Sequence, residues 1–117
     1  MWQKLPHWGI LVMVFIETSI FTRQIQKLIT DEHLRALQEW IATSPTVGKL
    51  IRGSGGCRKI RWNIATKGKR GGIRVIYYWL KDGDIVLLLL AYAKSSSDDL
   101  SQAQIKVLGE IVKRELR

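Results

Sequence analysis

The chain has few of the residues from which metal sites and covalent catalysts are usually built. Its 117 residues include one cysteine, Cys57, and two histidines, His7 and His33. A single cysteine cannot form a disulfide within the chain, and it leaves no Cys/His cluster for zinc. No GxSxG, GxGxxG or Walker sequence is present, and the acidic residues are scattered. These absences argue against metal-assisted, nucleotide-dependent and paired-carboxylate chemistry, and no cofactor is expected.

A hydrophobic run long enough to cross a bilayer is also missing near the N-terminus. Residues 8–16 are apolar, but this run is too short for a span and has no small-residue cleavage site after it. Because one cysteine suits a reducing compartment, we expect a cytoplasmic protein with no membrane partner. The length predicts one domain. We place it at residues 13–117 and treat residues 1–12 as an extension of uncertain status, since Met13 can serve as the initiator.

Acidic residues are absent from one long stretch of the chain. Between Lys49 and Lys81 there are ten lysines and arginines and no acid, whereas the remainder has nine basic and ten acidic residues. The formal net charge of +9 therefore arises from this segment. A positive segment without internal acids attracts polyanions such as RNA. The alternative is a solvated basic loop without a ligand.

Apolar periodicity and capping signals predict the element order β-α-α-β-β-β-α. Thr18 or Ser19 caps a first helix, Thr30 caps a second, and Ser101 with Gln104 forms the capping box of a C-terminal helix. The predicted strands cover residues 13–16, 57–64, 73–80 and 85–93. Segregated helices and strands indicate an α+β fold, with an N-terminal helical hairpin and a C-terminal helix packed on one face of a mainly antiparallel sheet. The strand over 85–93 is apolar on both faces, which predicts a central position.

Alternation along these strands gathers cations on one face. Lys59 and Arg61 share a face of their strand, Arg74 shares a face with Tyr78 on the next, and Tyr92 shares a face with Lys94. RNA is cleaved without a metal when its 2′-hydroxyl attacks the adjacent phosphate. The protein then has to align the attack, stabilise negative charge and move two protons. Lysine and arginine can do this, and crowding by other cations lowers the pKa of a lysine.

Two features of the same region have ordinary structural explanations. Trp62, Tyr77 and Trp79 are expected to pack in the core or on the sheet rather than stack on bases. The KGKRGG sequence at residues 67–72 lacks the strand-to-helix context of a nucleotide-binding loop, so it indicates a mobile basic loop rather than a mononucleotide site.

The sequences GSGGCRKIRW, KGKRGG, IRVIYYW and AYAKSSSDDL, taken in this order, resemble the RelE superfamily of bacterial toxins, most closely its HigB-like branch. The resemblance covers residues 13–117. It implies a RelE-like fold and a ribosome-dependent endoribonuclease that cuts mRNA in the A site, beside 16S rRNA. It also implies a cognate antitoxin that holds the toxin inactive in a hetero-oligomer.

The resemblance also assigns roles to residues. Lys59 and Arg61 match the two cations of the strand facing the RNA, Arg74 matches the arginine that binds the scissile phosphate, and Lys94 matches a basic position after the last strand. The family pattern continues with an arginine and a catalytic tyrosine, where this chain has SSSDDL. Tyr92 or a lysine would then transfer the protons. The predicted catalytic residues are Lys59, Arg61, Arg74, Tyr92 and Lys94, and the predicted RNA-binding residues are Arg58, Lys67, Lys69 and Arg70.

Two other functions fit the same sequence. A non-enzymatic RNA-binding module would use the basic surface without cutting. A gyrase-inhibiting toxin on the related ParE scaffold would block DNA replication, although basic residues on the central strands favour RNA.

Overall fold

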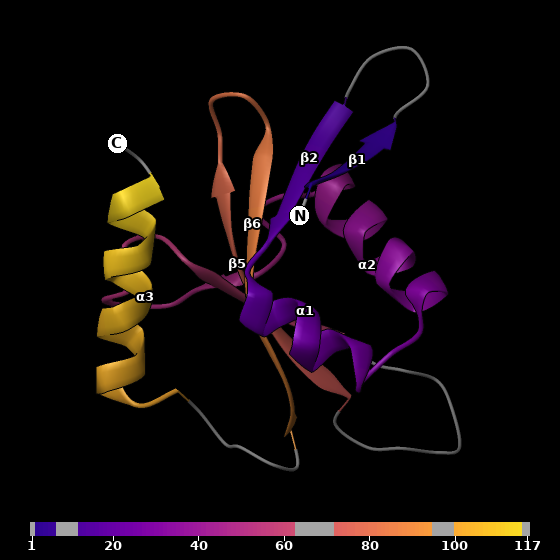
Figure 1. Cartoon of the computed structure of the whole chain (residues 1–117). Coiled ribbons are helices and arrows are strands. Elements are labelled where there is room, and N and C mark those ends of the chain that lie inside the picture. Colours follow the sequence, from indigo (N-terminus) through magenta and orange to yellow (C-terminus); the bar gives the residue numbers. More distant parts are fainter. Residues whose placement is uncertain (1, 7–11, 63–71, 95–99, 116–117) are drawn as a thin grey trace.

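The computed structural model describes residues 2–6, 12–62, 72–94 and 100–115. Within these residues the strands form one sheet in the order β1-β2-β6-β5-β4-β3 (Figure 1). The strands are β1 (Trp2–Pro6), β2 (Val12–Glu17), β3 (Lys49–Leu50), β4 (Arg58–Trp62), β5 (Ile73–Leu80) and β6 (Ile85–Ala93). The helices are α1 (Ser19–Gln26), α2 (Asp31–Thr43) and α3 (Gln102–Glu115). The predicted α+β class and the order of the main elements are confirmed.

The three helices begin at the predicted caps. The Thr18 hydroxyl accepts a hydrogen bond from the Phe21 N–H at 2.9 Å and so caps α1. The Thr30 hydroxyl accepts from the His33 N–H at 3.2 Å and caps α2. At α3 the capping box is reciprocal: the Gln104 N–H donates to the Ser101 hydroxyl, and the Ser101 N–H donates to the Gln104 side chain. Local hydrogen bonding therefore sets these boundaries.

β6 lies in the middle of the sheet, as its apolar sequence predicts. It pairs parallel with β2 on one side and antiparallel with β5 on the other. The remaining pairs, β1 with β2, β3 with β4 and β4 with β5, are antiparallel. The sheet is therefore mainly antiparallel, with both faces of β6 available for a hydrophobic core.

The expectation that all helices cover one face is wrong. α1 and α2 pack on one face, where Phe21 and Leu37 join the core around Tyr77. α3 lies on the opposite side of the sheet, where Leu108 and Val112 join a second core (Figure 1). The physical reason lies in β6, which carries leucines on both faces and needs an apolar cover on each.

Two strands were not predicted from the sequence. Trp2–Pro6, within the segment treated as an extension, form β1 and pair antiparallel with β2. β3 has two residues and pairs with the start of β4. Strands this short, or without clear alternation, give little periodic signal. The status of residues 1–12 in the native protein stays a prediction.

A bulge interrupts the pairing of β5 with β6. Ile76 pairs with Leu90, whereas Tyr77 pairs with Leu88, so Leu89 is the extra residue. Leu89 and Leu90 both belong to the core beneath α3. The Leu89 carbonyl accepts a hydrogen bond from the Thr18 hydroxyl at 2.9 Å, which ties the bulge to the start of α1.

Cys57 makes the stability of the fold sensitive to alkaline pH. Its side chain is fully buried beneath α3. Burial raises the pKa of the thiol from 9.0 to about 11, opposed by a hydrogen bond with Ser54. An unfolded thiol ionises from about pH 9 while the folded thiol stays protonated, so this contribution is complete below pH 9 and lost as pH rises towards 11.

We therefore expect the unfolding free energy to fall by about 2–3 kcal/mol more in the unaltered chain than in Cys57→Ala between pH 8.5 and 11. Urea unfolding at several pH values measures this difference. Parallel curves for the two proteins would show that the thiol does not contribute.

Candidate nucleic-acid interface

The central feature of the site is a row of residues that crosses three strands. Arg61 on β4 pairs directly with Arg74 on β5, and Arg74 pairs with Tyr92 on β6. Directly opposed residues project to the same face, with their Cβ atoms about 5 Å apart. We call Arg61, Arg74 and Tyr92 the cross-strand row.

Two lysines extend this row along the same region. Lys59 lies two residues before Arg61, so alternation places it on the same face of β4, and its side chain is half-buried. Lys94 lies two residues after Tyr92 and is exposed. The Lys94 N–H donates to the Gly72 carbonyl at 3.3 Å, which holds the end of β6 against the start of β5. The five residues that were predicted to be catalytic therefore lie on three neighbouring strands, in or beside the cross-strand row.

The pairing of Arg61 with Arg74 is electrostatically unfavourable for the fold alone. Like charges directly opposite each other on neighbouring strands destabilise a sheet. Arg61 is exposed and Arg74 is half-buried, so both can reach the surface of this face. An anion placed between the two guanidinium groups would turn their repulsion into a two-sided attraction, and arginine binds phosphate in a bidentate geometry. This face is thus suited to a phosphate group.

Tyr92 differs from the cations in its surroundings. Its ring packs against the core beneath α3, and its hydroxyl oxygen is covered from solvent. Proton exchange between this hydroxyl and a substrate would require the cover to move. The catalytic role of Tyr92 stays a prediction, and the lysines are better exposed for proton transfer.

Arg58 lies on the other face of β4. It pairs with Tyr77, and its guanidinium donates to the Gly48 carbonyl at 2.7 Å and to the Thr46 carbonyl at 3.2 Å. These bonds fasten the segment after α2 to the sheet. Arg58 is therefore separated from the cross-strand row by the thickness of the sheet, and its predicted role in RNA binding is not supported by this position.

The three other predicted RNA-binding residues, Lys67, Lys69 and Arg70, lie outside the described residues. The SSSDD sequence at residues 95–99 also lies outside them. Their roles stay predictions from the sequence.

The aromatic residues near the site pack in the core, as expected. Tyr77 is 0% exposed, and Trp62 and Trp79 pack against the core beneath α1 and α2. Trp62 also contacts Trp40, with ring centroids 5.5 Å apart. The expectation of packing rather than base stacking is confirmed for Tyr77, Trp62 and Trp79.

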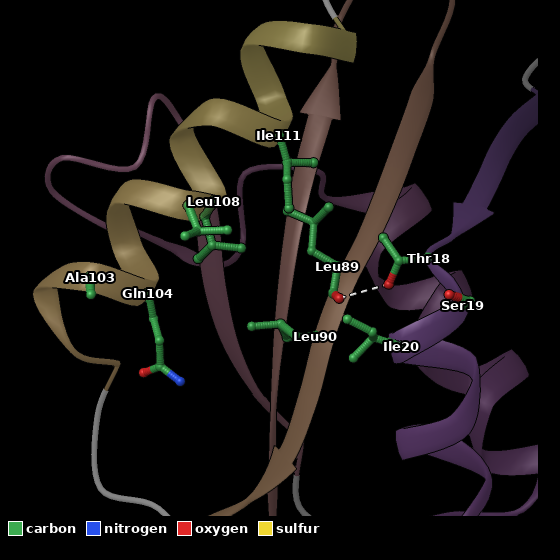
Figure 2. A pocket seen from close by; sticks show the side chains of 10 residues that line it. Thr18, Ser19, Ile20, Leu89, Leu90, Ala103, Gln104, Leu108 and Ile111 are labelled. Carbon is green, nitrogen blue, oxygen red and sulfur yellow. Dashed lines mark hydrogen bonds between the residues drawn. The ribbon is translucent and has the colours of Figure 1, made fainter.

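An apolar groove that was not predicted from the sequence lies between α3 and the start of α1, with β6 as its floor. Its volume is about 430 Å³. Figure 2 shows the side chains that line it. Ile20 and Val107 stand on its two walls and are 48% and 52% exposed. Both residues lie outside the apolar stripes that bury their helices. An apolar residue beside the stripe of each helix, which the packing of that helix does not explain, was the signal in the sequence that could have indicated the groove.

Comparison with known proteins agrees with this architecture. No protein-family model matches the chain. Among solved structures, the chain is similar to the Escherichia coli toxin RelE, determined in the free state as a double arginine-to-alanine variant. The TM-score is 0.56 at 20% sequence identity, and the match covers 86% of this chain and 94% of that one. The chain has a RelE-like fold.

Two further properties concern only the described residues. None of their helices is both long enough and apolar enough to cross a membrane. They contain no group of three or more histidine, cysteine, aspartate or glutamate side chains placed to hold a metal ion.

Proposed function

We propose that this chain is the toxin of a toxin–antitoxin system, of the HigB-like branch, and that it cleaves mRNA in the A site of the ribosome. The observation that carries the proposal is the cross-strand row, in which two directly opposed arginines lie on a sheet of RelE-like topology. The acid-free basic segment around this row supports an RNA ligand. Such a protein would work in the cytoplasm.

The proposed reaction uses the RNA as its own nucleophile. The 2′-oxygen forms a bond to the adjacent phosphorus, the bond from phosphorus to the 5′-oxygen breaks, and the products carry a 2′,3′-cyclic phosphate and a 5′-hydroxyl. One proton leaves the 2′-hydroxyl and another reaches the 5′-oxygen. Arg61 and Arg74 stabilise the extra negative charge on the phosphate, because fixed cations act where charge develops. No step requires a metal or a cofactor.

The proton carriers come from the remaining members of the site. Lys59 lies beside Arg61 on β4 and is half-buried, so it can approach the phosphate held by the two arginines. Lys94 is exposed at the end of β6 and can approach from the other side of Arg74. The Tyr92 hydroxyl is enclosed, and we assign Tyr92 a smaller role in proton transfer than the two lysines. Lys67, Lys69 and Arg70 are kept as candidates for contacts to mRNA or 16S rRNA.

Mapping mRNA ends after induction tests the proposal. We expect new 5′-hydroxyl ends within translated codons, and no such ends on the same mRNA when its start codon is removed. Lys59→Ala/Arg74→Ala should abolish both the cuts and the growth arrest. Growth arrest without mRNA cuts, accompanied by gyrase inhibition, would favour a ParE-like activity instead.

A non-catalytic RNA-binding module is the second candidate. It is favoured by the enclosed hydroxyl of Tyr92 and by SSSDDL in place of the family's catalytic residues. Both candidates predict binding of single-stranded RNA that weakens with salt, with a log–log slope of about −0.7 for each phosphate neutralised. A flat salt response would contradict both. Binding with this slope but without cleavage on ribosomes would select the module.

A further inference from the structure

β6 extends beyond the strand that pairs with it on the α1 side. The parallel pairing with β2 ends at Glu17, which lies opposite Leu88, and the Thr18 N–H donates to the Leu88 carbonyl at 3.1 Å. β6 itself continues to Ala93. From Leu89 onwards, this edge of β6 therefore needs hydrogen-bonding partners other than β2, because buried backbone groups have to be satisfied.

Two side chains, one at the start of α1 and one within it, supply such partners. The Thr18 hydroxyl donates to the Leu89 carbonyl at 2.9 Å (Figure 2). The Ala91 N–H donates to the side-chain oxygen of Gln24 at 2.8 Å. Leu89 and Ala91 are both buried, so water is a poor substitute for either bond. The Ala91 N–H therefore depends on Gln24.

Gln24 is a polar residue beside the apolar stripe of α1. The buried residues of this helix are Phe21 and Ile25, whereas Gln24 is half-buried. In an amide side chain only the oxygen can accept from an N–H, so the bond with Ala91 also fixes which way the Gln24 amide points. The acceptor of this side chain thus serves the strand rather than the helix.

The bond lies immediately before the part of β6 that belongs to the candidate site. Tyr92, the next residue, pairs with Arg74, and Lys94 follows two residues later. Strand pairing holds this end of β6 on the β5 side. Gln24 supports it on the α1 side. A misplacement of about 1 Å in reacting groups can lower a rate about 10²-fold, so the support of this strand end bears on the chemistry.

We infer that Gln24 is a positioning residue for the proposed reaction: its side-chain oxygen anchors β6 at Ala91 and thereby holds Tyr92 in the cross-strand row. Lys94, at the end of the same strand, is held by the same anchor. The inference rests on the proposed function for the reaction that is affected. The anchor itself is a property of the free chain.

Gln24→Met tests the anchor in the free chain. Methionine has nearly the helix propensity of glutamine but offers only a weak acceptor. Hydrogen exchange of the Ala91 amide, followed by NMR, should become at least tenfold faster, and the backbone proton contacts between Arg74 and Tyr92 should weaken. Gln26→Met is the matched control, since Gln26 is exposed on the same helix, and should leave the exchange within twofold. Gln24→Glu keeps an acceptor and should also stay within twofold of the unaltered chain.

The rate of mRNA cleavage gives a readout that a merely structural role would not change. In single-turnover reactions with saturating toxin, we expect Gln24→Met to lower the cleavage rate about tenfold, with the apparent affinity for ribosomes within twofold. Gln24→Glu should restore the rate. Urea midpoints show whether each variant is folded under the assay conditions. If Gln24→Met does not fold, Gln24→Ala takes its place, because alanine removes the acceptor and favours the helix.

Unchanged exchange of the Ala91 amide in Gln24→Met would overturn the inference, as would an equal acceleration in Gln26→Met. Faster exchange with an unchanged cleavage rate would also overturn it, because Gln24 would then be structural only. A failure of the proposed function has a different signature: the unaltered chain would cut no mRNA on ribosomes. The exchange of Ala91 and the contact of Tyr92 with Arg74 would then decide the anchor by themselves.

Discussion

Replacing Arg74 by alanine should lower the rate of mRNA cleavage on the ribosome by about 10²–10³-fold, the effect of removing one preorganised group that stabilises a developing anion. Arg74 occupies the middle of the cross-strand row, with Arg61 on one side and Tyr92 on the other. It is therefore the cation at the centre of this face. Single-turnover cleavage with excess toxin measures the chemical step separately from binding.

The control variant removes one positive charge at a position outside the cross-strand row. Arg52 is an exposed cation of the same basic segment, and Arg52→Ala should reduce the rate only through weaker long-range attraction, by less than tenfold. The urea midpoints of both variants are measured alongside, so that a loss in rate caused by unfolding is recognised. Equal rates for the two variants would show that phosphate binding is diffuse and that Arg74 has no special position.

The largest effect on stability is expected at Tyr77. Its side chain is fully buried, and its hydroxyl accepts from the Gly48 N–H at 2.9 Å and donates to the Pro45 carbonyl at 2.8 Å. Burial raises the pKa of this hydroxyl, opposed by the bond from Gly48 and the charge of Arg58. Tyr77→Ala should cost about 3–5 kcal/mol, the usual cost of deleting a buried aromatic ring. A loss of this size is a large part of the stability of a small domain.

The conservative variant separates the ring from the hydroxyl. Tyr77→Phe keeps the ring but leaves the buried Gly48 N–H without its acceptor, which should cost about 1–3 kcal/mol. Tyr78→Phe is the matched control, because Tyr78 is half-buried on the other face. Urea midpoints of the three variants measure the series. If Tyr77→Phe were as stable as Tyr78→Phe, the hydroxyl would not hold the segment after α2 in place.

The parts of the fold that the sequence predicts are those set by local chemistry. Thr18, Thr30 and the Ser101–Gln104 box start their helices because each side chain satisfies backbone groups within three residues. The central place of β6 follows from its composition. The same composition implies helices on both faces of the sheet, since a strand with two apolar faces requires cover on both. The order of elements along the chain, however, does not reveal on which face each helix packs.

The geometry of the candidate site depends on information that a sequence pattern lacks. Alternation predicts that Lys59 and Arg61 share a face, but not that Arg61 is directly opposite Arg74, because the register depends on how the strands are connected and where pairing is irregular. The burial of the Tyr92 hydroxyl and the position of Arg58 behind the sheet are tertiary effects of the same kind. Residue types were therefore easier to predict than their arrangement.

The bulge at Leu89 determines which face of the sheet Tyr92 belongs to. From Leu80 to Tyr77 the pairing with β6 is regular, and continued without interruption it would set Arg74 opposite Ala91. Tyr92 would then point towards α1 and α2. The extra residue shifts the alternation of side chains by one position. Tyr92 therefore lies opposite Arg74 and beside the two arginines of the row. Deleting Leu89 would remove only the extra residue and leave Tyr92 opposite Arg74, whereas a strand of unchanged length that lost the bulge would turn Tyr92 to the other face. The bulge is therefore as much a determinant of the site as the chemistry of β6.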